Sequence, residues 1–257
     1  AALRIERMEK EDDSPVTIYD RMIEKDFHQF KAEKYPDDGV FGEELDDWTR
    51  FSKRMWTIDP IDGTADFLSL GEDPKRKDFH FGTLTALFEN GEPRVGIGYW
   101  PKLKLDGRHP DGRVVARRDR KGILLNGKRV GRAQIDRMNE SKGVYLGAHP
   151  EAKRAMREAL TRYFESRGYA VVASVASGGD IAEMMLNGTA RLFIHLTPAG
   201  VDAPTNAFFA ERLDLKVSDR YGESIFPMRF QYLQEKLFFD SLVIGTAESH
   251  AEAMAAF

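Results

Sequence analysis

The sequence of 257 residues contains no cysteine. Disulfide bonds, thiolate metal ligands and cysteine nucleophiles are therefore excluded, and the composition fits a reducing compartment. A run of about 18 consecutive apolar residues, which a membrane-spanning helix needs, is also missing from the sequence. The first 14 residues are charged rather than apolar, so we expect no signal peptide. These features predict a cytoplasmic protein that does not span a membrane.

Positive charge does not dominate either, because 38 Lys and Arg residues stand against 42 Asp and Glu residues, for a net charge of −4. This balance argues against nucleic acid as the main partner. It does not exclude a small anionic substrate, because a bound metal ion can supply positive charge locally. The apolar share of 42% and the charged share of 31% are typical of a globular protein.

Hydrophobic periodicity and turn residues divide the chain into two styles of structure. In the first part we predict a helix over residues 17–34, a strand over 55–58, a hairpin of 82–89 with 94–100, and a second hairpin turning at Asn126-Gly127. In the second part we predict helices over 151–167, 181–187, 202–212 and 248–257, which alternate with strands over 169–172, 190–195, 215–218 and 241–244. This change predicts an α+β half over residues 1–140 and an α/β half over residues 141–257.

The segment from Trp56 to Thr64 is the most informative stretch of the sequence. Asp59 and Asp62 follow an apolar strand, and Gly63 permits a tight turn before Thr64, which can begin a helix. The free N–H groups of such a helix start bind anions. Carboxylates beside an anion would repel it unless cations lie between them. Oxygen ligands without Cys or His favour Mg²⁺ or Mn²⁺ over Zn²⁺, so the segment indicates a site for metal and phosphate.

On its own, an Asp-x-x-Asp-Gly segment is more often an exposed strand end followed by a turn. Two further acidic positions change the balance here. Glu43 lies upstream in the run Gly42-Glu43-Glu44, and Asp202 lies at the start of a predicted helix downstream. Taken singly, the first is typical of a solvated acidic pair and the second of a helix N-cap.

The order of these three motifs resembles the inositol monophosphatase superfamily of Mg²⁺-dependent, lithium-sensitive phosphatases. The resemblance extends from Ser14 to the C-terminal helix. It implies a layered α/β/α/β/α sandwich of the inositol monophosphatase and fructose-1,6-bisphosphatase type, and a homodimer. It also implies that residues 1–140 carry the metal and phosphate motifs and that residues 141–257 complete the site.

The resemblance implies a role for each matching residue. The metal ligands would be the carboxylates of Glu43, Asp59, Asp62 and Asp202, with the main-chain carbonyl of Ile61. Asp20 and Thr64 would orient and deprotonate the attacking water, and the N–H groups of Gly63 and Thr64 would hold the phosphate. The implied reaction is in-line attack of a metal-activated water on a phosphate monoester, without a covalent enzyme intermediate.

Asp20 also has a local explanation. It follows Thr17 by three residues, which is the spacing of a capping box at a helix start. The two roles are not exclusive. We therefore keep both interpretations of Asp20.

Two stretches are similar to the histidinol-phosphate phosphatase branch of the superfamily, which hydrolyses L-histidinol phosphate. These are residues 81–87 and the run Ser177-Gly178-Gly179-Asp180. The similarity implies that this run contacts the substrate and that Asp180 suits a cationic amine or imidazole. The local alternative for Asp180 is a helix N-cap. His195 stands where inositol-specific members carry an acidic residue, and it is either a substrate contact or a structural histidine.

Other substrates stay open at this point. Inositol phosphate is one, and the basic run Lys75-Arg76-Lys77 keeps a 3′(2′),5′-bisphosphate nucleotide or a sugar bisphosphate in consideration, although a solvated loop is the simpler interpretation. A regulatory protein that keeps the fold without activity is a further alternative. The presence of all four expected carboxylates argues against it.

Overall fold

The computed structural model describes residues 7–9, 15–44, 51–71, 79–130, 132–147, 153–174, 178–198, 200–230 and 240–257. Ser177 and the run Lys75-Arg76-Lys77 lie outside these ranges, so the predictions made for them stay predictions. Within the described ranges, no helix is both long and apolar enough to cross a membrane.

The larger sheet has seven strands in the described part of the chain, in the order β3-β4-β5-β6-β7-β8-β9. They are β3 Gly39–Gly42, β4 Arg54–Asp62, β5 Gly82–Glu89, β6 Glu92–Trp100, β7 Gly112–Arg117, β8 Ile123–Leu125 and β9 Lys128–Arg129. β3 and β4 are parallel, and every later neighbour is antiparallel. Both predicted hairpins are confirmed, and Asn90, Gly91, Asn126 and Gly127 have the positive φ angles that such two-residue turns require.

The smaller sheet has the order β11-β10-β12-β14-β13 among the described residues. Its strands are β10 Gly143–Gly147, β11 Ala170–Ala173, β12 Leu192–His195, β13 Lys216–Ser218 and β14 Leu242–Gly245. β11, β10 and β12 are parallel, whereas β14 is antiparallel to both of its neighbours. A separate short pair, β1 Arg7–Glu9 with β2 Pro15–Thr17, leads into the first helix.

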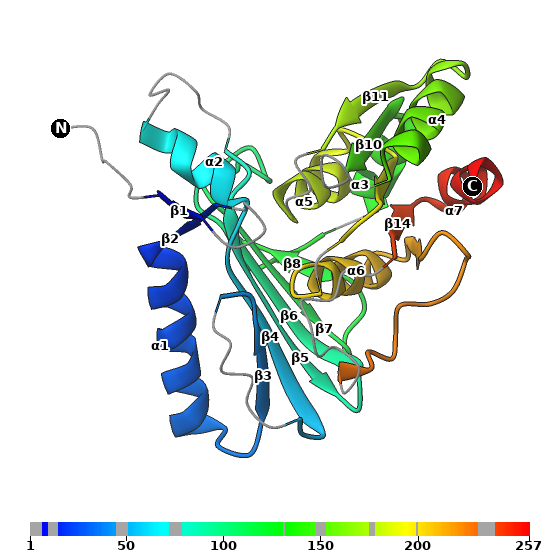
Figure 1. The fold of residues 1–257 in the computed structure, drawn as a ribbon. Helices are drawn as coiled ribbons and strands as arrows, with labels where there is room; N and C mark the ends of the chain where they lie inside the picture. Colours follow the sequence, from blue (N-terminus) through cyan, green and yellow to red (C-terminus); the bar gives the residue numbers. More distant parts are fainter. Residues whose placement is uncertain are drawn as a thin grey trace.

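The helices complete five layers, α/β/α/β/α (Figure 1). α1 Ile18–Lys34 packs on β4 at one face of the larger sheet, and α5 Gly178–Asn187 and α6 Ala203–Arg212 lie between the two sheets. α4 Arg154–Glu165 and α7 Ala247–Ala256 cover the far face of the smaller sheet. The remaining helices are α2 Thr64–Leu68, the 3₁₀ turn Ser69–Gly71 and α3 Arg132–Glu140, which packs on α5.

Strand β12 shows why these layers form. Its side chains alternate between two cores: Leu192 and Ile194 pack with the outer helices, while Phe193 joins the core between the sheets. Because both faces of the smaller sheet are covered at its centre, the fully buried strands β12 and β14 are nearly continuous apolar runs without polar alternation. In the inner core the large side chains of Trp100 and Phe208 are fully buried.

The structure corrects several predicted boundaries. The helix predicted over 181–187 begins at Gly178, so the glycine pair belongs to its first turn. The helix predicted over 202–212 begins at Ala203, with Asp202 as its N-cap. Strand β4 continues beyond residue 58 to Asp62. The strands β1, β2, β3, β7 and β10 and the helix α3 were not predicted. The division of the chain at residue 140 stays a prediction.

Candidate active site

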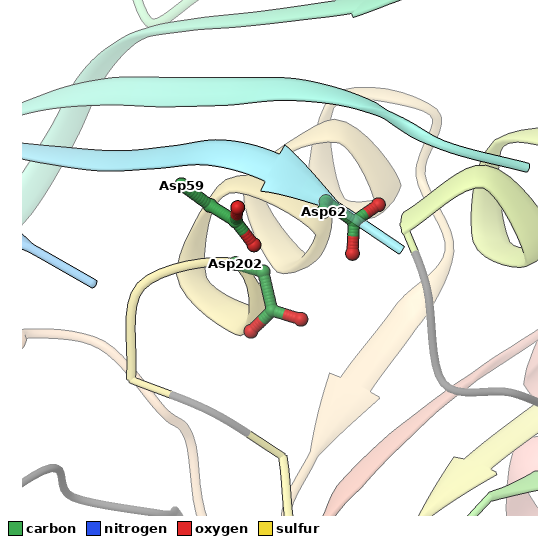
Figure 2. A group of neighbouring side chains, drawn as sticks. All are labelled: Asp59, Asp62 and Asp202. Carbon is green, nitrogen blue, oxygen red and sulfur yellow. The ribbon is translucent and has the colours of Figure 1, made fainter. Parts of the chain in front are cut away.

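Three aspartates from two elements meet between the larger sheet and α6. Asp59 and Asp62 lie at the end of β4, and Asp202 caps the N-terminus of α6, where its Oδ1 accepts the Ala203 N–H at 2.6 Å. One carboxylate oxygen from each lies within 4.8 Å of the others. Figure 2 shows the three side chains side by side. The packing of α6 against the larger sheet thus brings residues that lie far apart in the sequence to one point.

An irregularity in β4 allows two of these aspartates to lie together. Residues three apart in a regular strand point to opposite faces of the sheet. The pairing of β4 with β5 is regular up to Asp59 opposite Leu84, shifts, and resumes with Asp62 opposite Gly82. Such a bulge redirects side chains. The shift therefore brings both carboxylates to the same site.

Burial and the repulsion between neighbouring carboxylates dominate the electrostatics of this cluster. Asp59 is only 4% exposed, and its Oδ1 has no hydrogen-bond partner among the described residues. Burial, and then the charges of Glu43, Asp62 and Asp202, raise the pKa of Asp59 well above its usual value. Burial also raises the pKa of Asp62 well above its usual value and that of Asp202 to about 7. Converging oxygen donors of this kind fit Mg²⁺ or Mn²⁺.

Glu43 lies outside the group of three but next to it, because its charge raises the pKa of Asp59. The loop that carries Glu43 rests on Glu24, a fully buried residue of α1 whose Oε2 accepts the Glu44 N–H at 2.8 Å. A Cβ at Gly42 would lie 1.9 Å from Glu24 Oε1, so a larger residue there would push the Glu24 carboxylate out of its place. Glu24 therefore positions Glu43. The only sequence signal for it was a second acid one turn after Asp20 on a helix.

The structure gives Asp20 both of the contacts considered for it. Its Oδ2 accepts the N–H and the hydroxyl of Thr17 at 2.8 and 2.5 Å, which confirms the capping box. Its Oδ1 lies 3.4 Å from the Thr64 hydroxyl, which donates to the Ile61 carbonyl at 2.9 Å. Burial raises the pKa of Asp20. Gly63 has a φ of 79° and precedes α2, so Thr64 begins a helix as predicted.

The glycine pair lets α5 approach other parts of the protein. Gly178 donates its N–H to Asp62 Oδ2 at 2.6 Å, and a Cβ there would lie 2.7 Å from Leu84 Cδ1. A Cβ at Gly179 would lie 2.7 Å from the carbonyl oxygen of His80. Asp180 is the third residue of α5, so the N-cap alternative for it is wrong. The close approach therefore ties α5 to the aspartate cluster.

His80 was missed in the sequence, and its contacts are close. In the ring, Nδ1 lies 2.5 Å from Asp180 Oδ1 and Nε2 lies 3.6 Å from Glu183 Oε2. The main-chain N–H of His80 donates to Asp66 Oδ2 at 2.9 Å. Burial lowers the pKa of His80, but the hydrogen bond and charge of Asp180, with the charges of Glu183 and Asp66, outweigh it and raise the pKa. The second oxygen of Asp180 accepts the Ser174 hydroxyl at 2.5 Å.

His195 is not part of the aspartate group. Its side chain is 7% exposed and stacks on Phe193 with the ring centroids 6.3 Å apart. Burial lowers the pKa of His195 to about 4, so the ring is neutral near pH 7. The burial favours the structural interpretation, and a substrate contact by His195 stays a prediction.

The comparison with known families decides the classification of this fold. The model of the inositol monophosphatase family matches residues 2–202. The chain belongs to this family. The chain is 41% identical over 95 residues to the histidinol-phosphatase of Mycobacterium tuberculosis. This match covers 37% of this chain and 34% of that protein. The matched part thus spans about a third of the length of such curated relatives.

Solved structures show the same fold over almost the whole chain. A structure titled IMPase/NADP phosphatase complexed with Mg²⁺ and phosphate superposes with a TM-score of 0.70 at 20% identity, covering 99% of this chain and 86% of that one. The extragenic suppressor protein SuhB from Bartonella henselae superposes with a TM-score of 0.74 at 18% identity, covering 98% and 89%. At these identities the likeness establishes the layered fold.

Proposed function

We propose that this protein is a Mg²⁺-dependent phosphomonoesterase that hydrolyses a small, soluble phosphate ester. One observation carries the proposal: Asp59, Asp62 and Asp202 bring carboxylate oxygens within 4.8 Å of one another, and the buried Asp59 Oδ1 has no protein partner among the described residues. Membership of the inositol monophosphatase family supports the same conclusion. Mn²⁺ is the alternative ion, because it accepts the same oxygen ligands.

The residues of this chain divide the work around the ester. Glu43, Asp59, Asp62 and Asp202, with the carbonyl of Ile61, would hold the metal. When bound, it supplies positive charge to the phosphoryl oxygens and lowers the pKa of the attacking water. The Thr64 hydroxyl lies between Asp20 and the Ile61 carbonyl. In the proposed reaction, Asp20 would orient the Thr64 hydroxyl that positions the water, and the Asp20 carboxylate would receive the water's proton. The N–H groups of Gly63 and Thr64 are the proposed phosphate donors.

Phosphate release from a panel of esters tests this proposal. The panel contains L-histidinol phosphate, inositol 1-phosphate, adenosine 3′,5′-bisphosphate and fructose 1,6-bisphosphate, each with Mg²⁺ and with EDTA. L-histidinol phosphate is included because of the resemblance around Gly178, Gly179 and Asp180, and the others cover the alternative substrates. We expect Mg²⁺-dependent release from at least one ester and none with EDTA. Release that persists undiminished in EDTA would contradict the metal-dependent mechanism.

The family resemblance further supports a homodimer, and the absence of cysteine fits the cytoplasm. Light scattering on the purified protein tests the first of these. The expected mass is twice that of the chain, and the mass of a single chain would contradict the dimer.

A further inference from the structure

Two carboxylates of α5 hold the side chain of His80 between them. Asp180 and Glu183 are three residues apart, so they project from the same face of the helix. Each ring nitrogen of His80 faces one of them, at 2.5 Å for Nδ1 to Asp180 and 3.6 Å for Nε2 to Glu183. Nδ1 is within hydrogen-bond distance of Asp180 and the charge of Glu183 faces the other ring nitrogen, so both carboxylates favour the protonated imidazolium form of His80. The protonated His80 ring is a cation supplied by the protein itself.

This ion pair adjoins the aspartate cluster. The N–H of Gly178, two residues before Asp180, donates to Asp62 Oδ2 at 2.6 Å. The charge of Asp180 contributes to the raised pKa of Asp62, so the two carboxylates are electrostatic neighbours. In addition, Gly82 pairs with Asp62 between β5 and β4, and His80 lies two residues before Gly82. The side chain of His80 is 18% exposed. A group attached to a phosphate held at the aspartates would therefore be within reach of this pair.

Without His80, Asp180 and Glu183 would form an acidic subsite that attracts a cationic group. With it, the subsite is filled. One oxygen of Asp180 contacts the His80 ring and the other accepts the Ser174 hydroxyl. A substrate ammonium or imidazolium would have to displace a cation that is tethered to the same protein, and tethering gives that internal competitor a high effective concentration.

We propose that His80 is a specificity-determining residue: it fills the cation subsite formed by Asp180 and Glu183, so that the protein selects phosphate esters without a positively charged group over esters of amino alcohols. This inference rests on the proposed phosphatase function. It also changes the role proposed for Asp180: its carboxylate binds the imidazole of His80 and not a cationic group of the substrate.

Esters of matched size test the proposal. Ethyl phosphate and 2-aminoethyl phosphate differ in one ammonium group, and 2-phosphoglycolate carries a carboxylate instead. Each is measured with Mg²⁺ as a competitive inhibitor of the best ester of the panel, so that slow turnover of a small ester does not hide its binding. In the wild type we expect 2-aminoethyl phosphate to bind no better than ethyl phosphate. In His80→Ala the inhibition constant of 2-aminoethyl phosphate should fall about tenfold relative to that of ethyl phosphate.

Three variants serve as controls. His80→Lys keeps a cation facing Asp180 and should stay near the wild-type ratio. In the double variant His80→Ala with Asp180→Asn, the gain for 2-aminoethyl phosphate should disappear. His109→Ala is the matched histidine control, because His109 makes a 2.5 Å contact with Asp106 in the exposed segment between β6 and β7. Its ratio should equal that of the wild type.

The outcomes separate this inference from the proposed function. If His80→Ala folds, hydrolyses the best ester with Mg²⁺, and keeps the wild-type ratio of the two inhibition constants, the specificity role is wrong and the phosphatase stands. A wild type that binds 2-aminoethyl phosphate about tenfold more tightly than ethyl phosphate overturns the inference in the same way. If no ester is hydrolysed with Mg²⁺, the proposed function fails and this inference fails with it.

Discussion

Two groups of acidic side chains lie next to each other in this protein, and they differ in what balances their charge. Asp180 and Glu183 lie on either side of the ring of His80, so a basic group of the chain itself offsets part of their charge. Asp59, Asp62 and Asp202 have no Lys, Arg or His ion-pair partner in the described ranges. Buried carboxylates of like charge are costly unless they are protonated or meet a cation.

The difference teaches which group needs an external cation. In the first group, a histidine of the chain already faces both acids. In the second group, Asp59 and Asp62 have raised pKa values, and Asp59 Oδ1 has no hydrogen-bond partner among the described residues. A divalent ion resolves both features at once, because it accepts the free oxygen and removes the repulsion. This contrast supports the proposals of metal binding at the second group and of selectivity for the organic part of the ester at the first.

Removing one acid from the uncompensated group should have the largest effect. Asp59→Asn deletes a proposed metal ligand at the centre of the cluster, and we expect turnover to fall by more than about 100-fold, beyond what loss of a supporting residue around a metal costs. Thermal unfolding should show an intact fold, because the change also relieves repulsion. Asp119→Asn is the matched control, since Asp119 is exposed and pairs with Arg117 at 2.7 Å. If Asp59→Asn turned over the ester as fast as the wild type, the assignment of metal binding to the second group would be wrong.

A smaller effect is expected on stability without metal. Burial and then the charge of Glu43 raise the pKa of Asp202 from 3.8 to about 7. Between these values the folded protein holds a proton that the unfolded chain has released, so the free energy of unfolding falls as the pH rises through this window. The loss relative to Asp202→Asn should be on the order of 2 kcal/mol.

Urea unfolding in EDTA at about pH 5 and about pH 7.5 measures this loss. Mg²⁺ should restore the stability of the wild type more at the higher pH, because the ionised carboxylates are the metal ligands. A metal-free wild type that gains stability relative to Asp202→Asn over the same pH range would contradict the account.

Local patterns in the sequence predicted the parts of the site that depend on neighbouring residues. The helix that begins after Thr17, the Asn90-Gly91 hairpin and the spacing of Asp59 and Asp62 are all visible within short windows. The joining of Asp202 to them came from the family resemblance, since nothing local marks a helix N-cap as a metal ligand. The β-bulge that turns both strand aspartates to one side depends on pairing with β5. No short window of the sequence reveals it.

His80 and Glu24 show what the sequence could not supply. His80 acquires its role from Asp180, which lies 100 residues later in the chain. Glu24 supports the loop that carries Glu43, because its carboxylate contacts Gly42 and accepts the N–H of Glu44, which lies 20 residues later in the chain. Helix α3 was missed for a different reason: among its nine residues only Ile135 and Met138 are large and apolar, so its periodic signal is weak.

Binding of Mn²⁺ to the metal-free protein, followed by the electron paramagnetic resonance signal of the free ion, tests the central claim most directly. The comparison includes the wild type, Asp59→Asn and His80→Ala. We predict saturable binding by the wild type and by His80→Ala, and affinity at least about tenfold weaker in Asp59→Asn. Equal Mn²⁺ binding by the wild type and Asp59→Asn would contradict the claim that the three aspartates form the metal site.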